Sequence, residues 1–192
     1  MKASFIVHAG LAMLLSGACL VTALVTFLPG ASSAGHDSVV LGVCFASLFA
    51  VFAGAVVRGI ALVSHGVRVQ GNVMLQWFAL RCLPPAVQAA PAGLFVVGVV
   101  LLAGTVAGHD SRRAGEAENG RHYASQDDGP RHERVSVSRT EYQELREHDL
   151  RYMLAFMGLV ADLAAVGVLI TGQVHPTTRP QPQPAQGTAP AA

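Results

Sequence analysis

Charged side chains are scarce in this sequence. Asp, Glu, Lys and Arg make up 13% of its 192 residues, whereas roughly a quarter of the residues in an ordinary soluble domain are charged. The charges are also unevenly distributed, because ten of the twelve acidic residues lie within residues 110–149. The long segments outside this stretch are almost uncharged, which argues against a soluble fold. The scarcity of charge therefore indicates a membrane protein.

Other features are also missing, and each absence narrows the choice of function. The net charge of +1 gives no cluster of cations for a phosphate backbone, so we expect no nucleic acid among the partners. The three cysteines stand in or beside apolar runs, which is typical of small buried residues and not of a disulfide framework. No nucleophile elbow, phosphate loop, zinc-protease motif or dinucleotide fingerprint occurs. We therefore expect a protein without enzymatic activity or cofactor, although intramembrane enzymes can lack such motifs.

Apolar residues, in contrast, make up 52% of the chain. Four runs reach the length of about 20 apolar residues that crosses a hydrocarbon layer roughly 30 Å thick. Backbone polar groups in lipid must be satisfied internally, so these runs are expected to be helices. The sequence therefore predicts an all-α integral membrane protein, a four-transmembrane-helix bundle with helices at about 5–28, 39–63, 86–107 and 139–171.

The first apolar run has a second interpretation as a secretory signal peptide. Lys2 precedes it, and Ser32-Ser33-Ala34 resembles a cleavage site. The apolar part of a signal is only about 7–15 residues long, however, and this run is longer. We therefore expect the first helix to be retained.

The only sizeable polar segment is the loop at residues 108–138. Asp128-Gly129-Pro130 is a turn signal between two short stretches of β character, so a short hairpin is expected there. Ser138 and Glu141 match a capping box, which predicts that the fourth helix begins near Arg139. At about 1.5 Å per residue this helix would be about 50 Å long and would project about 20 Å from the membrane.

Two further segments complete the organisation of the chain. Residues 1–172 are predicted to form the transmembrane domain, and residues 173–192 are Pro/Gln/Ala-rich and are predicted to be a disordered tail. Between the second and third helices, apolar residues around Trp77 recur at helical spacing. This pattern fits a helix lying in the headgroup region, with a packed loop as the alternative.

Asp162 is the most informative single residue, because it lies near the centre of the fourth helix. A carboxylate at mid-membrane costs about 2.5–3.5 kcal/mol on insertion scales and usually faces protein or a water-filled cavity. It is then either protonated or hydrogen-bonded to a Ser or Thr of a neighbour. Asp162 shares its face with small residues, which suggests packing against another helix; these are Ala155, Gly158 and Ala165.

The second helix offers a matching surface. Small residues recur along it at steps of four and end at Arg58; they are Gly42, Ala46, Ala50 and Gly54. Such a stripe permits close approach of helices. A direct Arg58–Asp162 pair is not expected, because the two residues are offset by about 13 Å along the membrane normal.

The sequence Ala-Gly-His-Asp-Ser occurs twice, each time after an apolar run. His36, Asp37, His109 and Asp110 fall on the same side of a four-helix bundle and would suit a divalent metal. Capping explains the same letters better, because Gly suits the position after a helix and Asp or Ser suits the position before one. His8 and His65 raise the further alternative of a bundle-held haem.

The membrane orientation is less clearly encoded. Lys2, Arg58 and Arg68 favour a cytoplasmic N-terminus, whereas Arg112 and Arg113 favour a cytoplasmic loop. The first helix usually dominates, so we expect both termini in the cytoplasm. The usage of one Lys against twelve Arg points to a GC-rich bacterial genome, and hence to the bacterial cell (inner) membrane.

Three functions follow from these patterns. The leading hypothesis is a non-enzymatic assembly component that binds a membrane-protein partner, or copies of itself, within the lipid bilayer. The second is a small proton- or ion-coupled transporter component using Asp162. The third is a membrane metal or haem protein that uses the histidines.

Overall fold

The structure is a computed structural model. It describes residues 3–28, 37–64, 73–108, 112–118, 121–126 and 133–177.

Four long helices dominate the fold. Each is long and apolar enough to cross a membrane, which confirms the four predicted apolar helices. Their bounds are Ala3–Val25 for α1, Asp37–Ser64 for α2, Pro85–Ala107 for α4 and Arg139–Thr177 for α5. The last helix continues past the predicted end at residue 171, because Gly172 is buried within it and does not terminate it.

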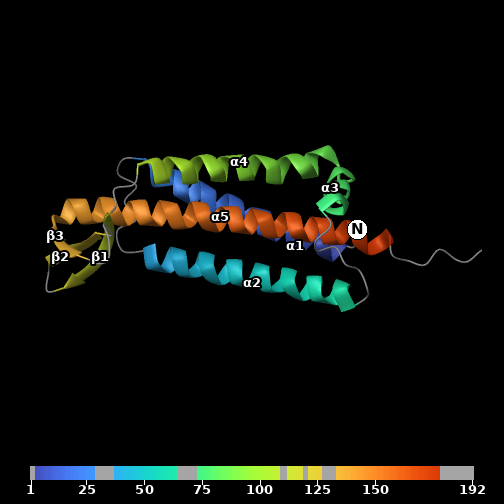
Figure 1. Ribbon diagram of the computed structural model, residues 1–192, viewed down its shortest axis with the longest axis horizontal. Coiled ribbons are helices and arrows are strands. Elements are labelled where there is room, and N and C mark those ends of the chain that lie inside the picture. The colour runs from blue at the N-terminus through green and yellow to red at the C-terminus, as the bar shows by residue number, and fades with distance from the viewer. Residues whose placement is uncertain are drawn as a thin grey trace, which may run out of the picture.

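The helices are arranged around α5. Figure 1 shows α5 in the middle of the view, with α4 along one side of it and α2 along the other. The most extensive helix contact is between α5 and α1, whereas α2 and α4 make almost no contact with each other in the described residues. The bundle is therefore an α1–α5 pair flanked by two outer helices.

The buried core likewise connects α5 to its neighbouring helices. One apolar cluster joins Leu20 and Ala23 of α1 to Leu101 of α4 and to Leu154 of α5. A second cluster nearer the opposite end of the helices contains Phe5 and Val168 among its members. Burial of these side chains is what orients the helices, because each apolar side chain removed from the surroundings adds close van der Waals contacts.

Two glycines, Gly158 of α5 and Gly98 of α4, lie close to leucine side chains near the level of Leu20. A Cβ atom at Gly158 of α5 would lie 2.9 Å from Leu20 Cδ2, and one at Gly98 of α4 would lie 3.5 Å from the same atom and 2.7 Å from Leu159 Cδ2. Real Cβ atoms essentially never approach to 2.7–2.9 Å, so a side chain added at either glycine would require a leucine side chain to shift. Three helices thus meet around one leucine.

The polar loop is a small sheet and not only a hairpin. Strands β1 (Arg112–Glu118), β2 (Arg121–Gln126) and β3 (Glu133–Val137) form an antiparallel sheet in the order β1-β2-β3. The predicted hairpin corresponds to β2 and β3. The all-α class is wrong in this one respect, because it did not include the sheet. β1 has the composition Arg-Arg-Ala-Gly-Glu-Ala-Glu, which does not favour a strand by itself; pairing with β2 and contacts with α5 supply its stability.

Two further local predictions, the start of α5 and the helix around Trp77, agree with the structure. The Ser138 hydroxyl accepts the backbone N–H of Glu141 at 3.2 Å, so α5 begins with the expected cap. The segment around Trp77 forms a short helix, α3 (Val73–Arg81), in which the Arg81 guanidinium lies 5.1 Å from the centre of the Trp77 ring. Of the two alternatives for this segment, the helix is therefore correct.

Candidate functional site

The sheet is fixed to the first turns of α5 by polar contacts. The Arg112 guanidinium and the Glu141 carboxylate form an ion pair at 2.8 Å. The Tyr142 hydroxyl donates to the carbonyl oxygen of Gly115 at 3.0 Å, and Asp149 accepts the backbone N–H of Ala114 at 3.3 Å. The sheet and α5 therefore form one head, which we define as β1–β3 with residues 139–149.

Arg151 joins this head to the end of α1. Its guanidinium donates to the carbonyl oxygen of Thr26 at 2.8 Å and to the Thr26 hydroxyl at 3.1 Å. It also pairs with Glu147 at 3.2 Å, one turn earlier on α5, and lies 4.7 Å from the centre of the Phe27 ring. The last carbonyl groups of α1 are bonded by Thr26, Phe27 and Leu28, and Arg151 in turn binds Thr26, the residue directly after the helix.

His148 makes a polar contact with the last turn of α4. One of its ring nitrogens lies 2.8 Å from the carbonyl oxygen of Thr105, in the last turn of α4. Arg151 and His148 belong to adjacent turns of α5 but serve different neighbours. The polar turns of α5 are therefore where the helices and the sheet are held together.

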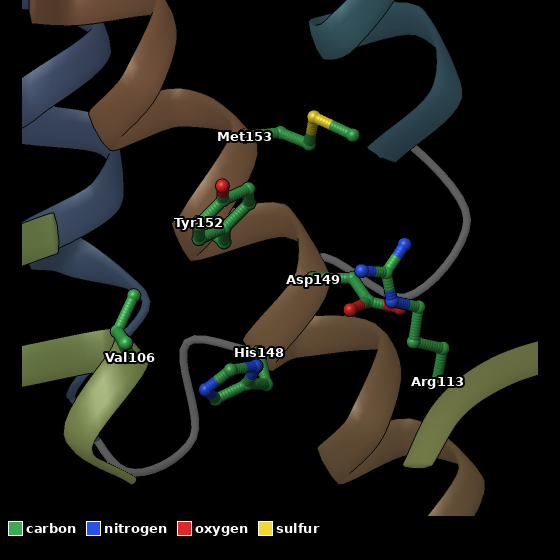
Figure 2. Close-up of a pocket in the computed structure, with 6 residues that line it drawn as sticks. All are labelled: Val106, Arg113, His148, Asp149, Tyr152 and Met153. Atoms are coloured by element: carbon green, nitrogen blue, oxygen red, sulfur yellow. The ribbon is translucent and has the colours of Figure 1, made fainter. Parts of the chain in front are cut away.

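A pocket of about 330 Å³ opens at this junction, lined by Val106, Arg113, His148, Asp149, Tyr152 and Met153. Figure 2 shows Arg113 extending from β1 toward the turn of α5 that carries Asp149, with Tyr152 and Met153 further along the helix. Val106, Tyr152 and Met153 are exposed and give the pocket apolar walls. The polar side of the pocket holds both the Arg113 guanidinium and the Asp149 carboxylate, and no Ser, Cys or Thr nucleophile is among the described residues that line it.

Asp162 lies elsewhere, in the interface between α5 and α1. It is 1% exposed, and its Oδ1 atom has no hydrogen-bond partner among the described residues. Ser16 of α1 is 0% exposed and its hydroxyl is unpaired in the same sense. The Ser16 carbonyl lies 3.4 Å from the Cβ position of Gly158, one turn before Asp162. Two unpartnered buried oxygens thus occur on facing helices.

Arg58 has partners other than Asp162 and Ser16. It donates to the carbonyl oxygen of Ser4 at 2.9 Å and lies 5.0 Å from the centre of the Phe5 ring. It therefore binds the start of α1, at the end of the bundle remote from the sheet.

The structure does not bring the two predicted small-residue faces together. On α5, Ala155 and Ala165 are 0% exposed, and Gly158 packs against Leu20 of α1. This face of α5 is thus buried, with α1 against Gly158 and with Leu41 and Cys44 of α2 packed against the cluster that contains Ala155.

The small residues of the α2 stripe lie in two different environments, one against α1 and one exposed. A Cβ atom at Gly54 would lie 2.5 Å from the His8 ring of α1, and that ring bonds to the carbonyl oxygen of Val51 at 3.0 Å. Gly42, Ala46 and Ala50, in contrast, are exposed. Most of the stripe therefore faces outward.

The metal hypothesis falls largely outside the described residues. His36, His109 and Asp110 are not among them, nor is His65, and Asp37 is described only as the first residue of α2. Within the described part of the chain, no group of three or more His, Cys, Asp or Glu side chains could hold a metal ion.

The sequence did not point to Arg112, His148 or Asp149 as junction residues. Their partners are Glu141, a carbonyl group of α4 and an N–H group of β1, which lie 29 to 43 residues away in the chain. The only available signal was the density of polar residues in the first turns of the predicted fourth helix.

No protein-family model matches the chain, and no curated protein or solved structure matches it.

Proposed function

We propose that the chain is a multi-pass, non-enzymatic protein of the bacterial cell membrane that assembles with a further transmembrane helix through α2. That helix belongs to a membrane-protein partner or to a second copy of the chain. The observation that carries the proposal is the exposed row of Gly42, Ala46 and Ala50 on a helix whose described apolar span has no buried residue.

Small residues have a specific use in a membrane. Lipid tails are as apolar as protein side chains, so helices associate in lipid through close packing and interhelical hydrogen bonds. A row of Gly and Ala allows two backbones to approach closely, and the exposed Val43 and Phe45 beside it would supply the surrounding contact. On α5 the corresponding row is buried, whereas most of the row on α2 is exposed.

In-cell photocrosslinking tests this assembly. A photoreactive residue at Val43 should crosslink to protein, giving a product of twice the mass for a second copy or a larger product of fixed mass for a partner. Gly42→Leu combined with Ala46→Leu should abolish the product, because leucine side chains keep the backbones apart.

The matched control is Gly93→Leu on α4, which is exposed and has open space for a side chain among the described residues. It should leave the crosslink intact. Crosslinking only to lipid, or equal loss in the control variant, would contradict assembly through α2.

A second candidate function is proton or ion coupling at Asp162. It is supported by the unpartnered Asp162 Oδ1 and Ser16 Oγ atoms in the α1–α5 interface of the described structure, since an intramembrane acid often marks an ion pathway.

Asp162→Asn separates the two functions. In liposomes, a transporter would lose ion flux in this variant while its α2 crosslink persisted. Assembly through α2 without transport predicts no Asp162-dependent flux in the parent protein and an unchanged crosslink in the variant.

A further inference from the structure

A second, open pocket lies at the outer end of the head. It has a volume of about 650 Å³ and is lined by Arg121, His122, Ser136, Val137 and Arg139. The sheet register explains how these residues meet, because His122 pairs with Val137 and Tyr123 pairs with Ser136. The start of β2, the end of β3 and the first residue of α5 thus converge at the end of the head where α5 begins (Figure 1).

Within the side chains that the structure describes, no acid neutralises the arginines of this pocket; Glu118, whose side chain is not among them, is the β1 residue that pairs with Arg121 in the sheet. Neither the Arg121 nor the Arg139 guanidinium has a hydrogen-bond or ion-pair partner among the described residues. Glu141, the nearest acid along α5, is paired with Arg112. Two guanidinium forks, each with several N–H donors, therefore line the pocket.

The N-terminus of α5 adds to the positive electrostatic potential of the pocket. The first N–H groups of a helix point outward without intrahelical partners, and the helix dipole places partial positive charge there. Ser138 caps the N–H of Glu141, and its own carbonyl accepts the N–H of Tyr142 at 2.9 Å. The 39-residue α5 thus directs its positive end toward the side that carries Arg139.

His122 is held in position at the pocket wall. Its ring stacks on the Tyr142 ring, with centres 4.7 Å apart and planes inclined by 27°, and the Tyr142 hydroxyl is itself bonded to Gly115. The Nδ1 atom of His122 is buried and has no hydrogen-bond partner in the described structure. The imidazole is therefore a further polar group whose bonding capacity the described residues do not use.

We propose that this pocket binds an oxyanion of the phosphate class, as inorganic phosphate or as the phosphate group of a larger molecule. Arginine forks bind phosphate oxygens in pairs, helix N-termini are regular phosphate sites, and the Ser136 hydroxyl is an additional donor. The proposal goes beyond the proposed function, because it concerns the head and is independent of α2.

The position of the pocket indicates a water-soluble source for the phosphate. At about 1.5 Å per residue, α5 rises about 18 Å between Arg139 and Arg151. Arg151 already binds the end of α1, so the pocket lies well above the level at which the helices meet the headgroups. A phosphate-bearing solute reaches it more directly than a headgroup of the same membrane.

Binding of inorganic phosphate to the full chain in phosphatidylcholine nanodiscs tests the proposal, measured by titration calorimetry at constant ionic strength. The parent should bind one phosphate per chain. Arg121→Gln and Arg139→Gln should each weaken binding by about tenfold or more, because each removes a charge-assisted hydrogen bond. Ser136→Ala, a smaller change, should weaken it by a few-fold.

The matched control is Arg134→Gln, which removes an exposed arginine of β3 outside the pocket and should leave binding unchanged. Unfolding midpoints measured without phosphate check that the variants are folded. Absence of saturable binding by the parent, or an equal loss in Arg134→Gln, would overturn the site.

Nanodiscs of phosphatidylglycerol distinguish the two sources of phosphate. Unchanged phosphate affinity in these discs supports a water-soluble ligand. Loss of phosphate binding there would show that a lipid headgroup occupies the pocket, which keeps the oxyanion chemistry and overturns the soluble source.

Discussion

Arg151 is the residue on which the junction of head and bundle depends most. Its side chain is 20% exposed and makes two hydrogen bonds to Thr26 and an ion pair with Glu147. Thr26 is buried, so its carbonyl oxygen would lose a partner that water cannot fully replace. Removing one member of a largely buried polar network costs more than the network adds in isolation.

We therefore predict that Arg151→Leu lowers the free energy of unfolding by about 2–4 kcal/mol. The measurement is equilibrium unfolding in detergent micelles, with Arg134→Leu as the exposed-arginine control. Glu147→Gln should cost less, since Arg151 keeps both bonds to Thr26. If Arg151→Leu unfolds no more readily than the control, the junction described above is wrong.

At the scale of elements, the α1–α5 pair is the centre of the fold, and glycine sets its spacing. A Cβ atom at Gly158 would lie 2.9 Å from Leu20 Cδ2 and 3.4 Å from the Ser16 carbonyl oxygen. Gly167, nine residues later on the same helix, is exposed, and the described residues leave space for a side chain there. The two positions differ in packing but share a helical backbone.

Gly158→Ala should destabilise the protein by about 1–3 kcal/mol, because Leu20 is 2% exposed and a packed core yields poorly to an added methyl group. Gly167→Ala should be neutral or stabilise by up to about 1 kcal/mol, since alanine favours helix over glycine. Unfolding in the same micelles measures both. Similar effects of the two substitutions would show that α1 and α5 are not packed this closely.

The helices and strands could be predicted from the sequence better than the contacts between them. The four apolar runs, the capped start of α5 and the β2–β3 hairpin were predictable, because each depends on local pattern and on the demands of lipid on the backbone. β1 was not, since its residues disfavour a strand and its stability comes from β2 and α5. The pairing of helices was also beyond reach, because Gly42 and Gly54 belong to one stripe yet only Gly54 meets α1.

For the candidate sites too, a single residue could be predicted from the sequence, but a pocket formed by several elements could not. Asp162 was identified from its charge and its position near the centre of an apolar run, and it is 1% exposed in the structure. The pocket of Arg121, His122, Ser136 and Arg139 was not foreseen, because it requires the register of β2 with β3 and the position of the first turn of α5. Sites that depend on three elements meeting are not visible in local sequence patterns.

At the scale of the whole molecule, an even number of membrane crossings would place the sheet on the opposite side of the membrane from the two chain ends. Figure 1 shows the sheet at one end of the bundle, and the N-terminus beside the last turns of α5 at the other. We propose the orientation with both termini in the cytoplasm and the head outside. Partners and phosphate-bearing ligands of the head would then be found in the cell envelope.

The most direct test of the account is the accessibility of two single cysteines in a cysteine-free chain, one replacing Arg134 in the head and one replacing Ala185 near the C-terminus. We predict that a membrane-impermeant thiol reagent labels the head position in intact cells and the C-terminal position only after lysis. The reverse pattern would invert the orientation and place the head's ligands in the cytoplasm. Labelling of both positions from the same side would contradict the four-span membrane topology itself.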